Sequence, residues 1–131
     1  MLVDTSVWID FFNGHESAQA GRLAQAITDN EPIAVAGIVL TEILLGLRRD
    51  SEAYRIAGLL EAFEEVRDPS RDDYIEAASI YRLCRSRGIT IRSTIDCLIA
   101  QLCIRDGLPL LGKDRDFEAI AKHMPLQLLA C

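Results

Sequence analysis

Two kinds of hydrophobic pattern alternate along the whole chain. Short, largely apolar runs, which fit buried strands of a parallel sheet, occur at residues 2–3, 33–36, 108–112 and 125–129. Residues 65–67, Glu-Val-Arg, are a further candidate for a short strand. Between these segments, apolar residues recur three and four positions apart, which is the spacing of amphipathic helices. These helical stretches cover residues 7–13, 17–29, 38–47, 51–63, 70–88, 95–107 and 113–123. The alternation predicts an α/β domain with a mainly parallel sheet and right-handed crossovers.

The stretch 70–88 carries the clearest helix signals. Ser70 followed by Asp73 is a capping-box pattern at the start, and Gly88 is suited to end the helix. The apolar stripe that the spacing predicts for this helix consists of Tyr74, Ala77, Ala78, Tyr81 and Cys84. Residues 89–92 have strand propensity, but the next helical pattern follows them directly.

Length and composition indicate one ordinary globular domain. A chain of 131 residues is close to the commonest domain size and can bury one hydrophobic core. Apolar residues make up 50% of it and charged residues 26%, so no segment is predicted to be disordered. Twenty acidic against 14 basic side chains give a net charge of -6, which argues against binding nucleic acid by bulk electrostatics alone. A bound divalent metal would invert the charge locally.

Cysteine usage and the hydropathy of the N-terminal region predict a cytoplasmic protein that does not enter a membrane. The four cysteines contain no C-x-x-C pair and no signal peptide precedes them, so free thiols in a reducing compartment are expected. The longest apolar run, residues 33–40, is far shorter than the roughly 20 residues that span a bilayer.

Four acidic residues lie at predicted junctions between elements. Asp4 directly follows the first strand, Glu42 lies in the first turns of the helix after the second, and Asp96 and Asp114 lie at helix starts. Each has a structural alternative: a turn residue, an exposed helix residue, a capping-box partner of Ser93, or an N-cap. Asp4, Glu42 and Asp96, however, have strongly apolar neighbours, and a buried carboxylate without a partner is costly. Together the acids therefore predict a cation site.

The residue types define the chemistry of such a site. Lys113 is the nearest basic residue that is placed to neutralise the acids, and one lysine is too few for four carboxylates. Oxygen ligands without histidine or cysteine at metal-ligand spacing favour Mg²⁺ or Mn²⁺ over zinc. Phosphodiester hydrolysis uses this arrangement, because the metal activates a water and stabilises the leaving oxygen, while a free carboxylate accepts the proton.

The sequences around these acids resemble those of PIN-domain nucleases, specifically the VapC-type toxins of bacterial toxin–antitoxin pairs. The motifs are Val-Asp-Thr-Ser at Asp4, Leu-Thr-Glu-Ile-Leu-Leu-Gly at Glu42, Arg-Ser-Thr-Ile-Asp-Cys-Leu-Ile-Ala at Asp96, and Lys-Asp-Arg-Asp-Phe at Asp114. The resemblance covers essentially the full length, so residues 1–131 are expected to form a single PIN-like nuclease domain. It implies a three-layer α/β/α sandwich, Mg²⁺- or Mn²⁺-dependent cleavage of RNA, a homodimer, and a small antitoxin protein that masks the site.

The resemblance also implies a role for each acid. Asp4 and Asp96 correspond to the principal metal ligands. Glu42 would complete the first metal site or orient water, and Asp114 would be the fourth acid. Asp116 either assists at a second metal or belongs only to the helix start.

Three further residues are predicted to surround the acids or the substrate. Thr5 or Ser6 is expected to form a hydrogen bond around Asp4. Arg92 is expected to contact RNA phosphates, as part of an arginine group that also contains Arg82, Arg85 and Arg87. The alternative for this group is a solvated helix end, where cations are favourable.

Trp8, Phe11 and Phe12 lie at helical spacing and have two possible roles. They either line a groove for an antitoxin helix or pack in the core, and we expect core packing for at least one of them.

Two functions of other classes remain as alternatives. A phospho-acceptor signalling domain shares the size and the α/β pattern, but it normally needs a second acid after the first strand, where Thr5 and Ser6 stand here. An inactive binding module on the same fold would not need the complete set of acids.

Overall fold

The computed structural model describes residues 1–131, and its centre is a four-stranded parallel sheet. The strands are β1 (Leu2–Val3), β2 (Ala34–Val35), β3 (Glu64–Glu65) and β4 (Leu110–Leu111), arranged in the order β3-β2-β1-β4. Leu2 of β1 pairs with Ala34 on one side and with Leu110 on the other. The sheet is parallel throughout, as the continuous apolar runs predict.

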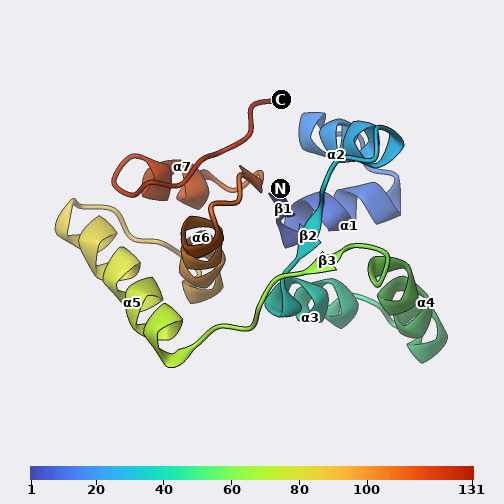
Figure 1. Cartoon of the computed structure of the whole chain (residues 1–131), viewed down its shortest axis with the longest axis horizontal. Helices are drawn as coiled ribbons and strands as arrows, with labels where there is room; N and C mark the ends of the chain where they lie inside the picture. Colours follow the sequence, from blue (N-terminus) through green and yellow to red (C-terminus); the bar gives the residue numbers. More distant parts are fainter.

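Seven helices cover the two faces of the sheet. They are α1 (Thr5–Asn13), α2 (Ala18–Thr28), α3 (Gly37–Leu45), α4 (Asp50–Leu60), α5 (Arg71–Ser86), α6 (Thr94–Asp106) and α7 (Arg115–Ala121). Helices α1 to α4 pack against one another on one side, and α5 to α7 pack together on the other (Figure 1). The predicted three-layer α/β/α sandwich is therefore confirmed.

The two central strands form the middle of the core. Both residues of β1 and both residues of β4 are fully buried, because helices cover both faces of the sheet. By contrast, Glu64 and Glu65 of β3 are exposed, since this strand is at the edge. Exposed charges on an edge strand discourage pairing with other chains.

Helix boundaries agree closely with the sequence signals. The capping box between Ser70 and Asp73 is present at the start of α5. Gly14 and Gly107 end α1 and α6 with φ angles of 67° and 64°, a left-handed conformation that glycine adopts without steric cost.

The strand predicted at residues 125–129 is reduced to a single parallel bridge, between Leu128 and Leu110. Residues 89–92 have strand propensity but form no strand, and helix α6 begins at Thr94. The buried stripe of α5 is also shifted: Ala77, Ile80 and Cys84 are buried, whereas Tyr74 is 56% exposed. Tertiary packing selected a neighbouring face of the helix, which periodicity alone does not distinguish.

A buried ion pair joins the start of α5 to the end of α6. Arg105 donates hydrogen bonds to Asp73 at 2.6 Å and to the backbone carbonyl of Arg67 at 2.8 Å. The backbone N–H of Ser70, together with Arg105, holds the pKa of Asp73 well below its usual range. The pair thereby ties the two helices to the segment that follows β3.

Trp8 is a core residue, as expected for at least one of the three aromatic residues of α1. It is 1% exposed and stacks on Phe12 with ring centroids 5.7 Å apart, while Phe63 lies 5.3 Å away. Phe11 and Phe12 are only half-buried. All four cysteines are free thiols, and no helix has the length and apolar character needed to cross a membrane.

Candidate functional site

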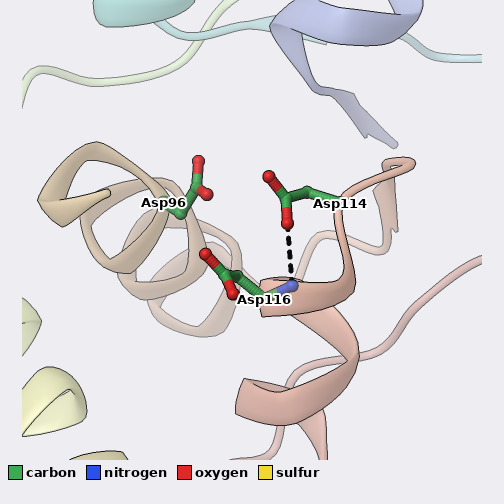
Figure 2. Close-up of side chains that lie close together, drawn as sticks. All are labelled: Asp96, Asp114 and Asp116. Carbon is green, nitrogen blue, oxygen red and sulfur yellow. Dashed lines mark hydrogen bonds between the residues drawn. The ribbon is translucent and has the colours of Figure 1, made fainter. Parts of the chain in front are cut away.

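Three aspartates gather where the start of α6 faces the start of α7. One carboxylate oxygen each from Asp96, Asp114 and Asp116 lies within 4.8 Å of the others (Figure 2). Asp96 is in the first turn of α6, and Asp114 and Asp116 begin α7. We refer to these three residues as the aspartate triad. It includes Asp116, for which the sequence left two roles open.

Local structure explains how each aspartate of the triad is held. Asp114 is the N-cap of α7, and its Oδ1 accepts the backbone N–H of Asp116 at 2.9 Å (Figure 2). The N-cap alternative for Asp114 is thus realised, but it occupies one oxygen and leaves Oδ2 available. Asp96 takes no part in a helix cap, because the side chain of Ser93 makes no capping hydrogen bond. The capping-box alternative for Asp96 is wrong.

Asp4 and Glu42 form a second pair of acids on the other helical layer. Asp4 is 6% exposed and lies directly between β1 and α1, where its carboxylate Oδ2 accepts a hydrogen bond from Ser6 Oγ at 2.9 Å. Thr5 Oγ1 donates to Glu42 Oε1 at 2.7 Å, which links α1 to α3. The hydroxyl of Ser6 therefore bonds Asp4 as predicted, and the hydroxyl of Thr5 contacts Glu42.

The two groups of acids are electrostatically coupled. Burial raises the pKa of Asp96 to about 7, and the negative charges of Asp4, Asp114, Asp116 and Glu42 add to this effect. Burial also raises the pKa of Asp4, although the hydrogen bond from Ser6 opposes it. The fold thus brings the other four predicted acids within electrostatic range of Asp96.

The position of Asp4 beside the triad follows from the parallel sheet. The carboxyl ends of parallel strands meet at one edge, where open α/β sheets place their ligands. The backbone N–H of Asp4 donates to the carbonyl of Leu111 at 2.9 Å, which joins the end of β1 to the end of β4. Gly112 follows at once, and a Cβ there would lie 3.0 Å from the ring of Phe117 and 3.7 Å from Cβ of Asp4. A glycine is therefore what this close approach requires.

Arg92 is the basic residue that contacts the triad. Its backbone N–H donates to Asp116 Oδ2 at 2.9 Å, and its guanidinium Nη2 donates to Asp114 Oδ1 at 3.3 Å. Arg85 and Arg87 lie at the C-terminal end of α5, as expected for cations that face a helix C-terminus.

Lys113 does not neutralise the acids of the site, contrary to its predicted role. Its ammonium group contacts the carboxylate of Asp10, a buried residue of α1. This hydrogen bond lowers the pKa of Asp10. Sequence reasoning missed Asp10, because no periodicity relates α1 to a loop more than 100 positions away.

The donor set fits a hard divalent cation. Every side-chain ligand that the five acids offer is a carboxylate oxygen, and the only basic side chain that contacts the aspartate triad is that of Arg92. Carboxylates with free oxygens and space for water are the ligands that Mg²⁺ and Mn²⁺ prefer.

Several known proteins are similar to this chain in sequence or in fold. Residues 1–123 match the family model described as the PIN domain. The chain is 34% identical over 128 residues to VapC ribonuclease Mb1587 of Mycobacterium bovis, covering 97% of this chain and 96% of that protein. Ribonuclease VapC11 of Mycobacterium tuberculosis shows the same identity and coverage.

Solved structures show that the fold is shared. VapBC2 from Rickettsia felis, crystallised with a promoter DNA fragment, has a TM-score of 0.75 at 20% identity, covering 98% of this chain and 96% of that one. A toxin–antitoxin complex from Klebsiella pneumoniae has a TM-score of 0.71 at 21% identity, with 97% and 98% covered. From the family match, the near full-length identity and the shared fold, it follows that the chain belongs to the PIN-domain family, among its VapC-type members.

Proposed function

We propose that this protein is a metal-dependent endoribonuclease that acts as the toxin of a toxin–antitoxin pair. The observation that carries the proposal is the convergence of five acids from separate segments on one edge of a parallel sheet. The relatives that are 34% identical over nearly the whole chain are themselves named as VapC ribonucleases. RNA as substrate and four free thiols fit a location in the cytoplasm.

Asp96, Asp114 and Asp116 are the residues that we assign to hold Mg²⁺ or Mn²⁺, with Asp4 as a further ligand. A divalent cation bound there lowers the pKa of a water molecule and stabilises the leaving oxygen of a phosphodiester. Asp114 Oδ1 and Asp116 Oδ2 already accept backbone N–H groups. The other oxygen of each carboxylate is therefore the one assigned to the cation.

Glu42 is the carboxylate that we assign to orient the attacking water and accept its proton. Thr5 holds Oε1 of Glu42 at 2.7 Å, which fixes the carboxylate and leaves Oε2 available. Ser6 fixes Asp4 in the same manner at 2.9 Å. In this proposal Thr5 and Ser6 position the acids, and Arg92 contacts the phosphate backbone of RNA.

The antitoxin partner is proposed to cover a groove between α1, α3 and α4. Its apolar lining consists of Ile9, Phe12, Ile43, Leu47 and Ile56. Phe12 is one of the aromatic residues for which the sequence suggested such a role. Substituting Ile9, which is 37% exposed, by Arg is expected to weaken binding of the protein encoded immediately upstream without changing RNA cleavage.

A second copy of this chain is proposed to bind the apolar groove between α5 and α6. This groove has a volume of about 370 Å³, and its lining includes Tyr74, Ala78, Tyr81, Ile95 and Leu98. Ala78→Arg is expected to convert a dimer to a monomer in light scattering. Glu76→Arg, an exposed position of α5 outside the groove lining, should leave the dimer intact.

The direct test is cleavage of total RNA by the purified protein without antitoxin, in the presence of Mg²⁺ or Mn²⁺. Cleavage is expected to stop on addition of EDTA and in the Asp96→Asn variant. Cleavage that persists under both conditions, or no cleavage with either metal, would refute the proposal. A stable acyl phosphate on one aspartate would instead support the phospho-acceptor alternative.

A further inference from the structure

Arg92 contacts the aspartate triad through its backbone and, separately, through its side chain. Its backbone N–H donates to Asp116 Oδ2 at 2.9 Å, and this bond does not depend on the side chain. The neighbouring Ile91 is 2% exposed and anchors the backbone in the core. The guanidinium makes the second contact, with Nη2 3.3 Å from Asp114 Oδ1 and Nε 3.7 Å from Asp116 Oδ2.

The guanidinium is free to leave, because its contacts are at the surface. The side chain of Arg92 is 70% exposed, whereas that of Asp116 is 11% exposed. Ion pairs with an exposed partner are weak, since water screens the attraction and ordering a long side chain costs entropy. Backbone N–H groups therefore hold the carboxylates of Asp114 and Asp116, whereas the guanidinium that faces them is held only by exposed contacts.

A divalent metal and the guanidinium compete for the same negative charge, although they face different oxygens. The guanidinium faces Asp114 Oδ1 and Asp116 Oδ2, whereas the metal is assigned to the free oxygens of the same carboxylates. Three carboxylates within 4.8 Å repel one another unless a cation lies among them. Lys113, the basic residue that precedes Asp114, instead forms an ion pair with Asp10. The one guanidinium that contacts the triad is thus placed to balance its charge before metal binds.

We propose that Arg92 is an exchangeable counter-cation of the aspartate triad, which a divalent metal displaces and which then contacts a phosphate of the substrate. This inference rests on the proposed metal-dependent function and adds a regulation of the same site. Metal binding thus releases the guanidinium of Arg92 from the triad and makes it available to RNA. The contact between Arg92 and the phosphate is therefore strongest when the metal is bound.

The test is the affinity of the RNA-free protein for Mn²⁺, measured from the electron paramagnetic resonance signal of the free ion. Arg92→Met keeps the backbone N–H and an unbranched side chain but removes the charge. Its Kd for Mn²⁺ should fall about two- to fivefold, the effect expected from losing a weak competing ion pair. Arg92→Lys should lie between Arg92→Met and the wild type.

Arg87→Met is the matched control, because it removes the same charge from a residue that contacts none of the triad. Its Mn²⁺ affinity should equal that of the wild type. In RNA cleavage, Arg92→Met should raise KM while kcat changes little. An unchanged or weaker Mn²⁺ affinity of Arg92→Met would overturn the inference, whether or not RNA is cleaved. Tighter Mn²⁺ binding without any cleavage would support it and refute the nuclease proposal separately.

Discussion

Replacing Asp96 by Asn should stabilise the metal-free protein at alkaline pH. In the folded chain, burial and four neighbouring acids raise the pKa of Asp96 from 3.8 to about 7. Such a shift corresponds to an upper bound of about 4 kcal/mol. Asp96 is only half-buried, so solvent screening reduces the expected gain to about 1–2 kcal/mol.

The sign of the pH dependence follows from proton binding. Between pH 4 and 7 the folded chain holds a proton on Asp96 that the unfolded chain has released, so the free energy of unfolding decreases as pH rises. The penalty is complete above pH 7 and absent below pH 4. Asp96→Asn should therefore match the wild type near pH 4 and exceed it by about 1–2 kcal/mol at pH 8.

Urea unfolding in EDTA, at several pH values, measures this difference. Asp72→Asn is the control, because it removes a charge from an exposed position in the first turn of α5. Loss of this charge should slightly destabilise the protein, since an acid there is favourable to the helix. Addition of Mg²⁺ or Mn²⁺ should stabilise the wild type at pH 8 more than Asp96→Asn. If Asp96→Asn were less stable than the wild type at pH 8, or equally different at all pH values, the electrostatic reasoning would be refuted.

Three other substitutions test how the fold supports the site. Arg105→Met leaves a buried carboxylate without its partner and should lower the free energy of unfolding by about 3 kcal/mol in urea denaturation, whereas a loss below about 1 kcal/mol would contradict a buried pair. Gly112→Ala places a methyl group 3.0 Å from the ring of Phe117 and should cost about 1 kcal/mol by overpacking, seen as a lower Tm in calorimetry; an unchanged Tm would mean that the ring yields. Thr5→Val removes the hydrogen bond to Glu42 and should lower kcat by about three- to tenfold in RNA cleavage while the circular dichroism spectrum stays the same. Undiminished kcat in Thr5→Val would exclude a positioning role for Thr5.

Local sequence signals are sufficient for most of the fold. The alternation of apolar runs and helical spacing predicts the helices and the parallel sheet, because both periodicities arise from backbone geometry within a few residues. The capping box at Ser70 is likewise a local interaction, and it is present. Burial faces are less predictable: α5 buries Ile80 rather than Tyr74, because the partner helix α6 decides which of two adjacent stripes is covered.

The acids of the site are likewise determined partly by local sequence and partly by the tertiary structure. Residue type, apolar neighbours and position at element junctions are enough to mark Asp4, Glu42, Asp96 and Asp114 as candidate ligands. Only the tertiary fold brings Asp114 and Asp116 into contact range of Asp96. It also assigns Thr5 to Glu42 and Lys113 to Asp10, contacts that join segments 37 and 103 positions apart in the chain. Side-chain types and local spacing are written in the sequence, whereas the partner of each charge depends on which loops the packed sheet and helices place side by side.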